Sequence, residues 1–312
     1  MIFTPNTSRH LQIREVNEKA TAYPTAFVAE EIDRYRAEVS RVEDWLNDVN
    51  VRRRVVLLSG PSSSGKTTTA NLLCARLRRD GVDAHVVSLD DFYRGRGQAP
   101  RLPDGSYDYE TPEALDLPLL ASCIRELLEE GHTLLPQFDF PSGQPKAERV
   151  PLTLSQRSVV IFEGIHALHP HLREQLPKKH VKRLLIHPHS TFYDGEEEIL
   201  SNRQIRLVRR MVRDERHRGT PAAGTLTMWP GVVRGEELYL FPHADCADMV
   251  IDTTHAFEPC MFAARALPLL KGIPQDHPRY SLVSEIETAL SKFCHMSPEL
   301  LPEDAILREF LD

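Results

Sequence analysis

Residues 55–67 read VVLLSGPSSSGKT, an apolar segment that runs into a loop of glycines and serines and ends in Lys66 and Thr67. The loop matches the pattern G-x-x-x-x-G-K-[S/T] at every fixed position. Glycines let the backbone curl so that several N–H groups point at phosphate oxygens, and the helix that follows adds the positive end of its dipole. The sequence therefore predicts a phosphate-binding loop made of Gly60, Ser62, Ser63, Ser64, Gly65, Lys66, Thr67 and Thr68.

The last two motif positions indicate which phosphate compound is bound. A lysine at position 66 reaches the β- and γ-phosphates of a nucleotide, and a threonine hydroxyl at position 67 ligates Mg²⁺. An ordinary Gly/Ser turn would not explain both residues. We therefore expect ATP and Mg²⁺ as cofactors.

From Arg53 onward, apolar strands alternate with helices, a pattern typical of a parallel sheet covered on both faces. Strands are predicted at 55–59, 84–89, 159–162, 181–186 and 249–251. Helices are predicted from the loop to residue 79, where Gly81 ends the helix, and at 112–130, 197–217, 257–270 and 280–293. The fold class is α/β, a doubly wound parallel sheet.

Two of these strands end in carboxylates. Asp90 follows the strand at 84–89, and Glu163 follows the strand at 159–162. The carboxyl ends of parallel strands line the crevice in which such sheets bind ligands. Asp90 can accept the proton of a substrate hydroxyl and approach the metal, or it can simply cap a turn; Glu163 suits a direct or water-mediated Mg²⁺ ligand. Together with the loop, these carboxylates favour a kinase.

Overall composition excludes several other classes of protein. The net charge of −7 and pI near 6.1 argue against a nucleic-acid partner. No apolar run approaches the length of a membrane span, and residues 1–20 lack the apolar core of a signal peptide. Five scattered cysteines fit reduced thiols better than a disulfide framework. We expect a cytoplasmic protein whose partner is a small hydroxylated molecule.

Four motifs together resemble the uridine kinase and phosphoribulokinase family: GPSSSGKTT (60–68), SLDDFY (88–93), FDFPSG (138–143) and FEGIHAL (162–168). The resemblance covers roughly residues 50–270. It is strongest to bacterial uridine-kinase-like proteins in which the kinase follows a threonyl-tRNA-synthetase-like region. Only about 50 residues precede the kinase here, too few for that region. RLVRRMVRDERHRG (206–219), MWPGVVRGEE (228–237) and AILREFL (305–311) also look like that lineage.

The resemblance implies a role for each matching residue. Asp90 would be the general base, assisted by Lys66, and Thr67, Asp90 and Glu163 would surround Mg²⁺. Tyr93, Glu110 and Phe138 would line the acceptor pocket. Arg206, Arg209 and Arg213 match the arginines of a mobile lid at about 203–224 that closes over the phosphates.

The same arginines can be examined from their spacing alone. Arg206, Arg209, Arg210 and Arg213 share one helix face. That face could clamp phosphates, form salt bridges with Asp214 and Glu215, or contact nucleic acid. The first reading is favoured, because arginines stabilise charge on a transferring phosphoryl group.

Two departures from the family pattern concern the acceptor. Gly143 stands where many uridine–cytidine kinases place a histidine that reads the pyrimidine, and Phe138 lacks the hydroxyl of a tyrosine. We expect phosphorylation of the 5′-hydroxyl of a pyrimidine nucleoside. The alternatives are another alcohol, such as a sugar phosphate or a pantothenate-like acceptor, and a regulatory ATP-binding module without catalysis.

We divide the chain into a helical arm (1–50), a P-loop kinase core (51–275) and a helical C-terminal extension (276–312). In the arm, apolar residues follow a 4-3-4-3 spacing on one stripe of a helix at 25–49. They are Val28, Ile32, Tyr35, Val39, Val42, Leu46 and Val49. This stripe could pair with a second subunit in a homo-oligomer, or it could cover the catalytic core.

Overall fold

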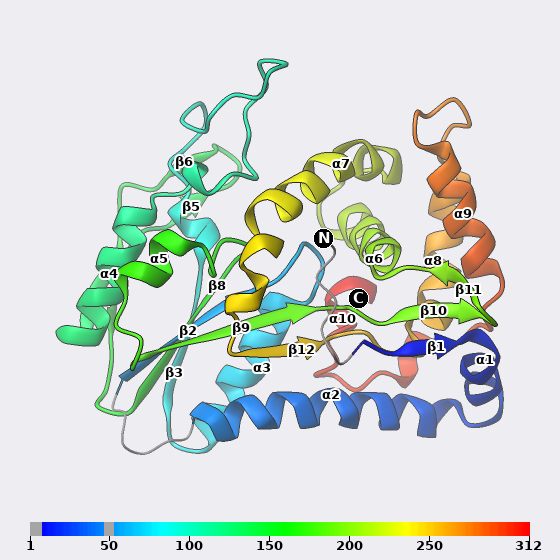
Figure 1. Cartoon of the computed structure of the whole chain (residues 1–312), viewed down its shortest axis with the longest axis horizontal. Helices are drawn as coiled ribbons and strands as arrows, with labels where there is room; N and C mark the ends of the chain where they lie inside the picture. The colour runs from blue at the N-terminus through cyan, green and yellow to red at the C-terminus, as the bar shows by residue number, and fades with distance from the viewer. Residues whose placement is uncertain (1–7, 47–52) are drawn as a thin grey trace.

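The computed structural model describes residues 8–46 and 53–312. All five predicted strands lie in one parallel sheet with the order β12-β9-β2-β8-β3 (Figure 1). They are β2 (Arg53–Ser59), β3 (Asp83–Ser88), β8 (Ser158–Glu163), β9 (Val181–His187) and β12 (Met249–Asp252). Strands are added on both sides of β2, so the crevice beyond its carboxyl end is where such a sheet binds ligands.

Alternate residues of the central strand face two different hydrophobic layers. Val56 and Leu58 pack in the layer that holds α2 (Pro24–Leu46), α3 (Lys66–Arg79) and α8 (Glu258–Lys271). Val55 and Leu57 pack against the layer of α4 (Leu117–Glu129) and α5 (Pro170–Gln175). Because strand side chains alternate between faces, continuous burial of β2 requires helices on both sides. The predicted doubly wound architecture is confirmed.

The long N-terminal helix α2 packs along its own subunit (Figure 1). Its stripe residues from Val28 to Leu46 are all at most 3% exposed and belong to the main core cluster, while Val49 lies outside the described residues. This burial confirms the second reading of the stripe, which covers the catalytic core. The stripe is therefore not free to bind a second subunit.

The helix predicted at 197–217 begins later than expected. Residues 197–200 form strand β11 (Glu197–Leu200), which pairs with β10 (Thr191–Asp194) around Gly195, and β10 also pairs with β1 (His10–Gln12). Helix α6 (Asn202–His217) starts only after Ser201. The Ser201 hydroxyl accepts a hydrogen bond from the backbone N–H of Gln204, and the Gln204 side chain bonds back to Ser201 N. This capping box fixes the boundary.

Asp116 shortens another predicted helix in the same way. Its carboxylate accepts the N–H of Leu119, so α4 starts at Leu117, and residues 112–114 form the separate turn η2. Gly81 follows α3 with φ of +75°, as its predicted role as a helix terminator requires.

The other elements are α1 (Ile13–Ala22), η1 (Leu89–Phe92), η2 (Pro112–Ala114), β4 (His132–Leu135), β5 (Phe138–Asp139), β6 (Gln144–Pro145), β7 (Val150–Thr153), α7 (Ala222–Tyr239), η3 (Phe241–Cys246), α9 (Tyr280–Ser291), η4 (Pro298–Leu300) and α10 (Arg308–Leu311).

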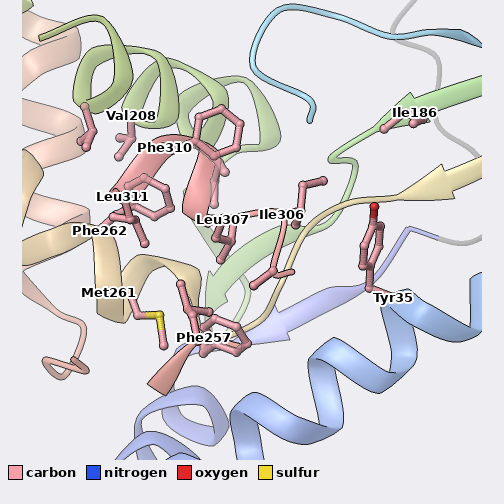
Figure 2. Packing of buried hydrophobic residues seen from close by; sticks show 14 of the residues in the cluster. Tyr35, Ile186, Val208, Phe257, Met261, Phe262, Ile306, Leu307, Phe310 and Leu311 are labelled. Carbon is pink, nitrogen blue, oxygen red and sulfur yellow. The ribbon is translucent and has the colours of Figure 1, made fainter. Parts of the chain in front are cut away.

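The C-terminal segment is built into the core. Figure 2 shows its apolar side chains from Ile306 to Leu311 among Val208 of α6, Phe257 before α8, and Phe262 of α8. Ile306, Leu307, Phe310 and Leu311 are completely buried. Its last residues therefore lie close to the helix that follows the predicted phosphate loop. Among the described residues, no helix has the length and apolar character that a membrane crossing requires.

Candidate active site

The loop at 60–67 leaves β2 and enters α3 with the backbone that phosphate binding requires. Ser63 and Gly65 have positive φ values of 59° and 86°. At Gly65, an added Cβ would lie 2.2 Å from Cδ1 of Ile306, so both conformation and space require glycine. The first N–H groups of α3, beginning at Lys66, have no acceptor in the preceding turn, and the helix dipole favours an anion there. This geometry suits a phosphate group.

Lys66, Thr67 and Glu163 converge beside the loop. The Thr67 hydroxyl donates to Oε1 of Glu163 at 3.2 Å, and Nζ of Lys66 donates to the carbonyl of Pro61 at 3.1 Å. Burial lowers the pKa of the Lys66 ammonium, an effect that the carboxylates of Glu163 and Asp90 oppose. Burial raises the pKa of Glu163, which Lys66 opposes. The sequence analysis predicted that these three residues would share one site.

Asp90 follows the end of β3 and lies close enough to Lys66 for their charges to interact. It does not cap the turn η1, because the Ser88 hydroxyl accepts its N–H at 3.3 Å and takes that role. The Asp90 side chain remains accessible to solvent, yet the surrounding protein atoms partly desolvate it and raise its pKa, while Lys66 and Arg218 oppose this rise. A carboxylate in this place is free to bind a hydroxyl.

Oxygen ligands suitable for Mg²⁺ meet in this corner. They are the hydroxyl of Thr67 and the carboxylates of Glu163 and Asp90, which are hard donors of the kind that Mg²⁺ prefers. Among the described residues, no cluster of three or more His, Cys, Asp or Glu side chains forms a complete metal cage. Mg²⁺ is usually held by one or two carboxylates together with substrate phosphates, so the residues present fit this metal.

The residues predicted for the acceptor lie together next to Asp90. The rings of Tyr93 and Phe138 are 5.6 Å apart, and the Tyr93 hydroxyl donates to the carbonyl of Tyr109 at 3.3 Å. Glu110 follows, half-buried against Gly235 of α7. Burial raises the pKa of Glu110, which Arg210 opposes. An aromatic wall beside a carboxylate suits a flat or hydroxylated acceptor.

The arginines of α6 divide into two groups. Arg206 and Arg209 are at most 1% exposed and form buried ion pairs with Glu236 and Glu258. In this arrangement both guanidiniums are paired with buried carboxylates, and the phosphate clamp expected from helix spacing stays a prediction for these two arginines. The spacing showed that the arginines share a face, but it did not show on which side of the loop that face lies.

The arginines of the second group are less deeply buried. Arg210 donates to the Ser62 hydroxyl at 2.6 Å and, like Arg213, forms an ion pair with Asp214. Arg218 is exposed, forms an ion pair with Asp214 at 3.5 Å and opposes the rise in the pKa of Asp90. Arg210 belongs to the helix face that the spacing predicted as a phosphate clamp, whereas Arg218 was not singled out. The position of Arg218 four residues after Asp214 was the signal that could have indicated it.

The C-terminal segment contacts the first turn of α3. The Thr68 hydroxyl donates to the Glu309 carboxylate, and Arg213 lies 3.9 Å from the same carboxylate. Composition and motif spacing gave no indication of this contact, because more than 230 residues separate its partners. A negative charge thus lies one residue beyond the proposed metal ligand Thr67.

Comparison with known proteins identifies the family. The family model described as "Phosphoribulokinase / Uridine kinase family" matches residues 55–257, more than half of the chain. The chain belongs to this kinase family. The match spans all five strands of the central sheet.

Individual members of the phosphoribulokinase/uridine kinase family resemble the chain at modest identity. A uridine kinase of Deinococcus deserti is 28% identical over 214 residues, which cover 68% of this chain and 93% of the relative. Uridine-cytidine kinase B of Dictyostelium discoideum is 28% identical over 199 residues, covering 63% and 73% of the two chains. The structure of a possible uridine kinase from Bacillus stearothermophilus aligns with a TM-score of 0.46 at 20% identity, covering 70% of this chain and 98% of that one.

Proposed function

We propose that this kinase transfers the γ-phosphoryl group of ATP to the 5′-hydroxyl of a pyrimidine nucleoside. The proposal rests mainly on one observation, the convergence of Lys66, Thr67, Glu163 and Asp90 around the loop at the carboxyl ends of β2, β3 and β8. Membership of the kinase family and the relatives named uridine kinase support it.

Each of these side chains has a chemical task in the proposal. Asp90 accepts or orients the proton of the attacking hydroxyl, and its raised pKa brings it closer to neutrality as a base. Lys66 places its charge beside the phosphates, and Thr67 and Glu163 hold the metal. Bound Mg²⁺ would neutralise charge on the transferred group. In the proposal, Arg210 and Arg218, which are less buried, approach that group, while Arg206 and Arg209 stay in their buried ion pairs.

The acceptor assignment draws on the wall formed by Tyr93, Phe138 and Glu110. The two rings can stack against a base, and Glu110 can accept hydrogen bonds from ribose hydroxyls. This assignment takes each of the three residues in the role that the family resemblance implies.

A second candidate is an alcohol that carries its own negative charge, such as a sugar phosphate. The specific observation is at Gly143, where the family's base-reading histidine is absent. Arg96 donates its backbone N–H to the Gly143 carbonyl at 2.6 Å, and a Cβ on Gly143 would lie 3.2 Å from Nε of Arg96. A guanidinium at this place would attract an anionic acceptor.

A panel of acceptors tests the proposal. ADP release is measured with ATP, Mg²⁺ and, in turn, uridine, cytidine, adenosine, ribulose 5-phosphate and pantothenate. Turnover that depends on uridine or cytidine supports the nucleoside assignment, and turnover only with the sugar phosphate or pantothenate transfers it to the second candidate. Binding of ATP without acceptor-dependent ADP release would contradict catalysis and favour a regulatory ATP-binding module.

A further inference from the structure

Buried side chains bind backbone carbonyls of the phosphate-binding loop. Arg206 Nη1 donates to the carbonyl of Ser62 at 3.2 Å, and Arg209 Nη1 donates to the carbonyl of Ser63 at 3.3 Å. The Thr253 hydroxyl donates to the carbonyl of Ser64 at 2.8 Å. Three consecutive carbonyl oxygens of the loop are therefore bound by side chains.

Because the peptide unit is planar, fixing a carbonyl also fixes the direction of the N–H group in the same unit. Within one peptide unit, the carbonyl of a residue and the N–H of the next residue point in opposite directions. Fixing the carbonyls of Ser62 and Ser64 therefore also fixes the N–H groups of Ser63 and Gly65, which point away from the anchoring side chains. In such a loop, N–H groups that point inward bind the anion.

The ion pair of Arg206 and Glu236 binds both the N–H and the carbonyl of Ser62. We call an ion pair that holds the loop backbone in this way a bracket. The two side chains form a bidentate ion pair, with N–O distances of 2.6 and 2.7 Å. While Arg206 binds the Ser62 carbonyl, Oε1 of Glu236 accepts the Ser62 N–H at 2.9 Å. Both side chains are at most 1% exposed. The pair thus fixes the orientation of Ser62 relative to helices α6 and α7.

A second ion pair, between Arg209 and Glu258, holds the next residue of the loop, Ser63. Arg209 pairs with Glu258 at 2.7 and 3.1 Å and also donates to the carbonyl of Thr253 at 2.8 Å, the residue whose hydroxyl holds Ser64. A buried ion pair is seldom required for stability, because well-packed apolar residues can often replace both partners without loss. These two pairs therefore need an explanation besides stability.

We infer that Arg206 and Glu236 are positioning residues that preorganise the phosphate-binding loop, with Arg209 and Glu258 as a second bracket. This inference rests on the proposed binding of ATP to the loop. Preorganised N–H donors bind an anion without having to reorient, so loss of the bracket weakens nucleotide binding while the fold persists. In this inference, Arg206 and Arg209 hold the backbone of the loop and do not contact the transferring phosphoryl group.

In the alternative account, Arg206 binds the phosphates of ATP, and its ion pair with Glu236 keeps it away from them in the absence of ATP. The two accounts differ in sign for Glu236→Gln. If Glu236 restrains a clamp, neutralising it frees the guanidinium, and the affinity for Mg²⁺·ATP rises. If the pair is a bracket, the same change weakens the hold on Ser62, and the affinity falls.

Titration calorimetry of the full chain with Mg²⁺·ATP measures the difference. For the bracket we expect the dissociation constant to rise about tenfold in Glu236→Gln and by at least as much in the double variant Arg206→Met/Glu236→Leu, which removes both charges together. An unchanged or lower dissociation constant in Glu236→Gln overturns the inference, and this holds even where the double variant does not fold.

A matched control separates the bracket from a general loss of stability. Arg183 and Asp248 form a bidentate pair at 2.5 and 3.1 Å at the amino-terminal end of β9, away from the loop. The variant Arg183→Met/Asp248→Leu is expected to change thermal stability without changing the ATP dissociation constant. Equal weakening in the control contradicts the inference. Absence of ATP binding by the wild-type protein is a distinct result, because it contradicts the proposed function itself.

Discussion

Asp90 and Lys66 influence each other's protonation. The Asp90 carboxylate favours the charged form of Lys66, and the Lys66 ammonium lowers the pKa of Asp90 against the larger effect of desolvation. The net result is an aspartate that holds its proton more strongly than usual. This balance suits a residue that must take a proton during the reaction.

The protonation of Asp90 can be measured directly. Titration of side-chain carboxyl resonances by NMR, with Asp90→Asn identifying the signal, should give a pKa above the ordinary value of 3.8. Below that raised pKa the carboxylate is protonated and cannot act as a base, so the acidic limb of turnover should also lie higher than for an ordinary aspartate. Lys66→Met should raise the pKa further. A pKa at or below 3.8 in the wild type would contradict the environment described for Asp90.

Single residues differ in how far their sequence context revealed their positions. The loop glycines, Lys66 and Thr67 lie in one contiguous motif whose backbone conformation is locally determined, so their arrangement could be predicted. The contacts of Arg206 and Arg209 with the loop carbonyls could not be predicted from spacing. Their partners Glu236 and Glu258 are 30 and 49 residues away, and the direction of the helix face depends on that distant packing.

At the scale of elements, the C-terminal segment and α3 form a boundary of the proposed donor site. The Glu309 carboxylate accepts the hydroxyl of Thr68 in the first turn of α3, and Ile306 fills the space beside Gly65. The positive end of a helix dipole attracts anions, so Glu309 and the phosphates of a nucleotide would compete for the same region. We therefore expect Glu309 to influence the affinity for the phosphate donor.

Replacing Glu309 by Gln tests that competition. Glutamine retains a hydrogen-bond acceptor for Thr68 but removes the negative charge, so the KM for ATP should fall several-fold, corresponding to about 1 kcal/mol for a partly screened charge. Glu303→Gln, at an exposed position of the same segment, should leave the KM unchanged. An increase of the KM in Glu309→Gln would show that the carboxylate contributes to binding ATP instead.

Elements were predicted best where burial dictated a continuous pattern. All five strands of the parallel sheet contain an apolar core of consecutive or alternating residues, and their positions were recognised. Strands β1, β10 and β11 were missed because they are short and partly exposed, so they have no comparable pattern. The start of α6 was misplaced by the same hairpin, although the Ser201 and Gln204 capping pair marks it in the sequence.

At the scale of the whole molecule, buried neutral histidines connect stability to pH. His255 is completely buried between Tyr35 and Phe257, and burial lowers its pKa from 6.5 to about 3. The unfolded chain therefore binds a proton at His255 between these two values while the folded chain does not. By linkage, the contribution to stability is fully present above pH 6.5 and is lost as the pH falls toward 3.

Urea unfolding at several pH values measures this effect. Between pH 6.5 and 4.5, His255→Gln should lose less free energy of unfolding than the wild type, by up to about 1.4 kcal/mol per pH unit. His132→Gln, at an exposed position, should follow the wild-type curve. Parallel curves for His255→Gln and the wild type would contradict burial of a neutral His255.

The central claim is that the loop seats the donor phosphate and that Asp90 acts on the acceptor hydroxyl. Steady-state turnover of Asp90→Asn, with the acceptor identified from the panel, tests it most directly. Asparagine nearly preserves the shape of the side chain but cannot accept the proton, so turnover should fall roughly 10²–10⁴-fold while the dissociation constant for ATP stays close to the wild-type value. Asp276→Asn, at an exposed position in the C-terminal extension, should retain full activity. Near-normal turnover of Asp90→Asn would remove Asp90 from the mechanism and contradict the account.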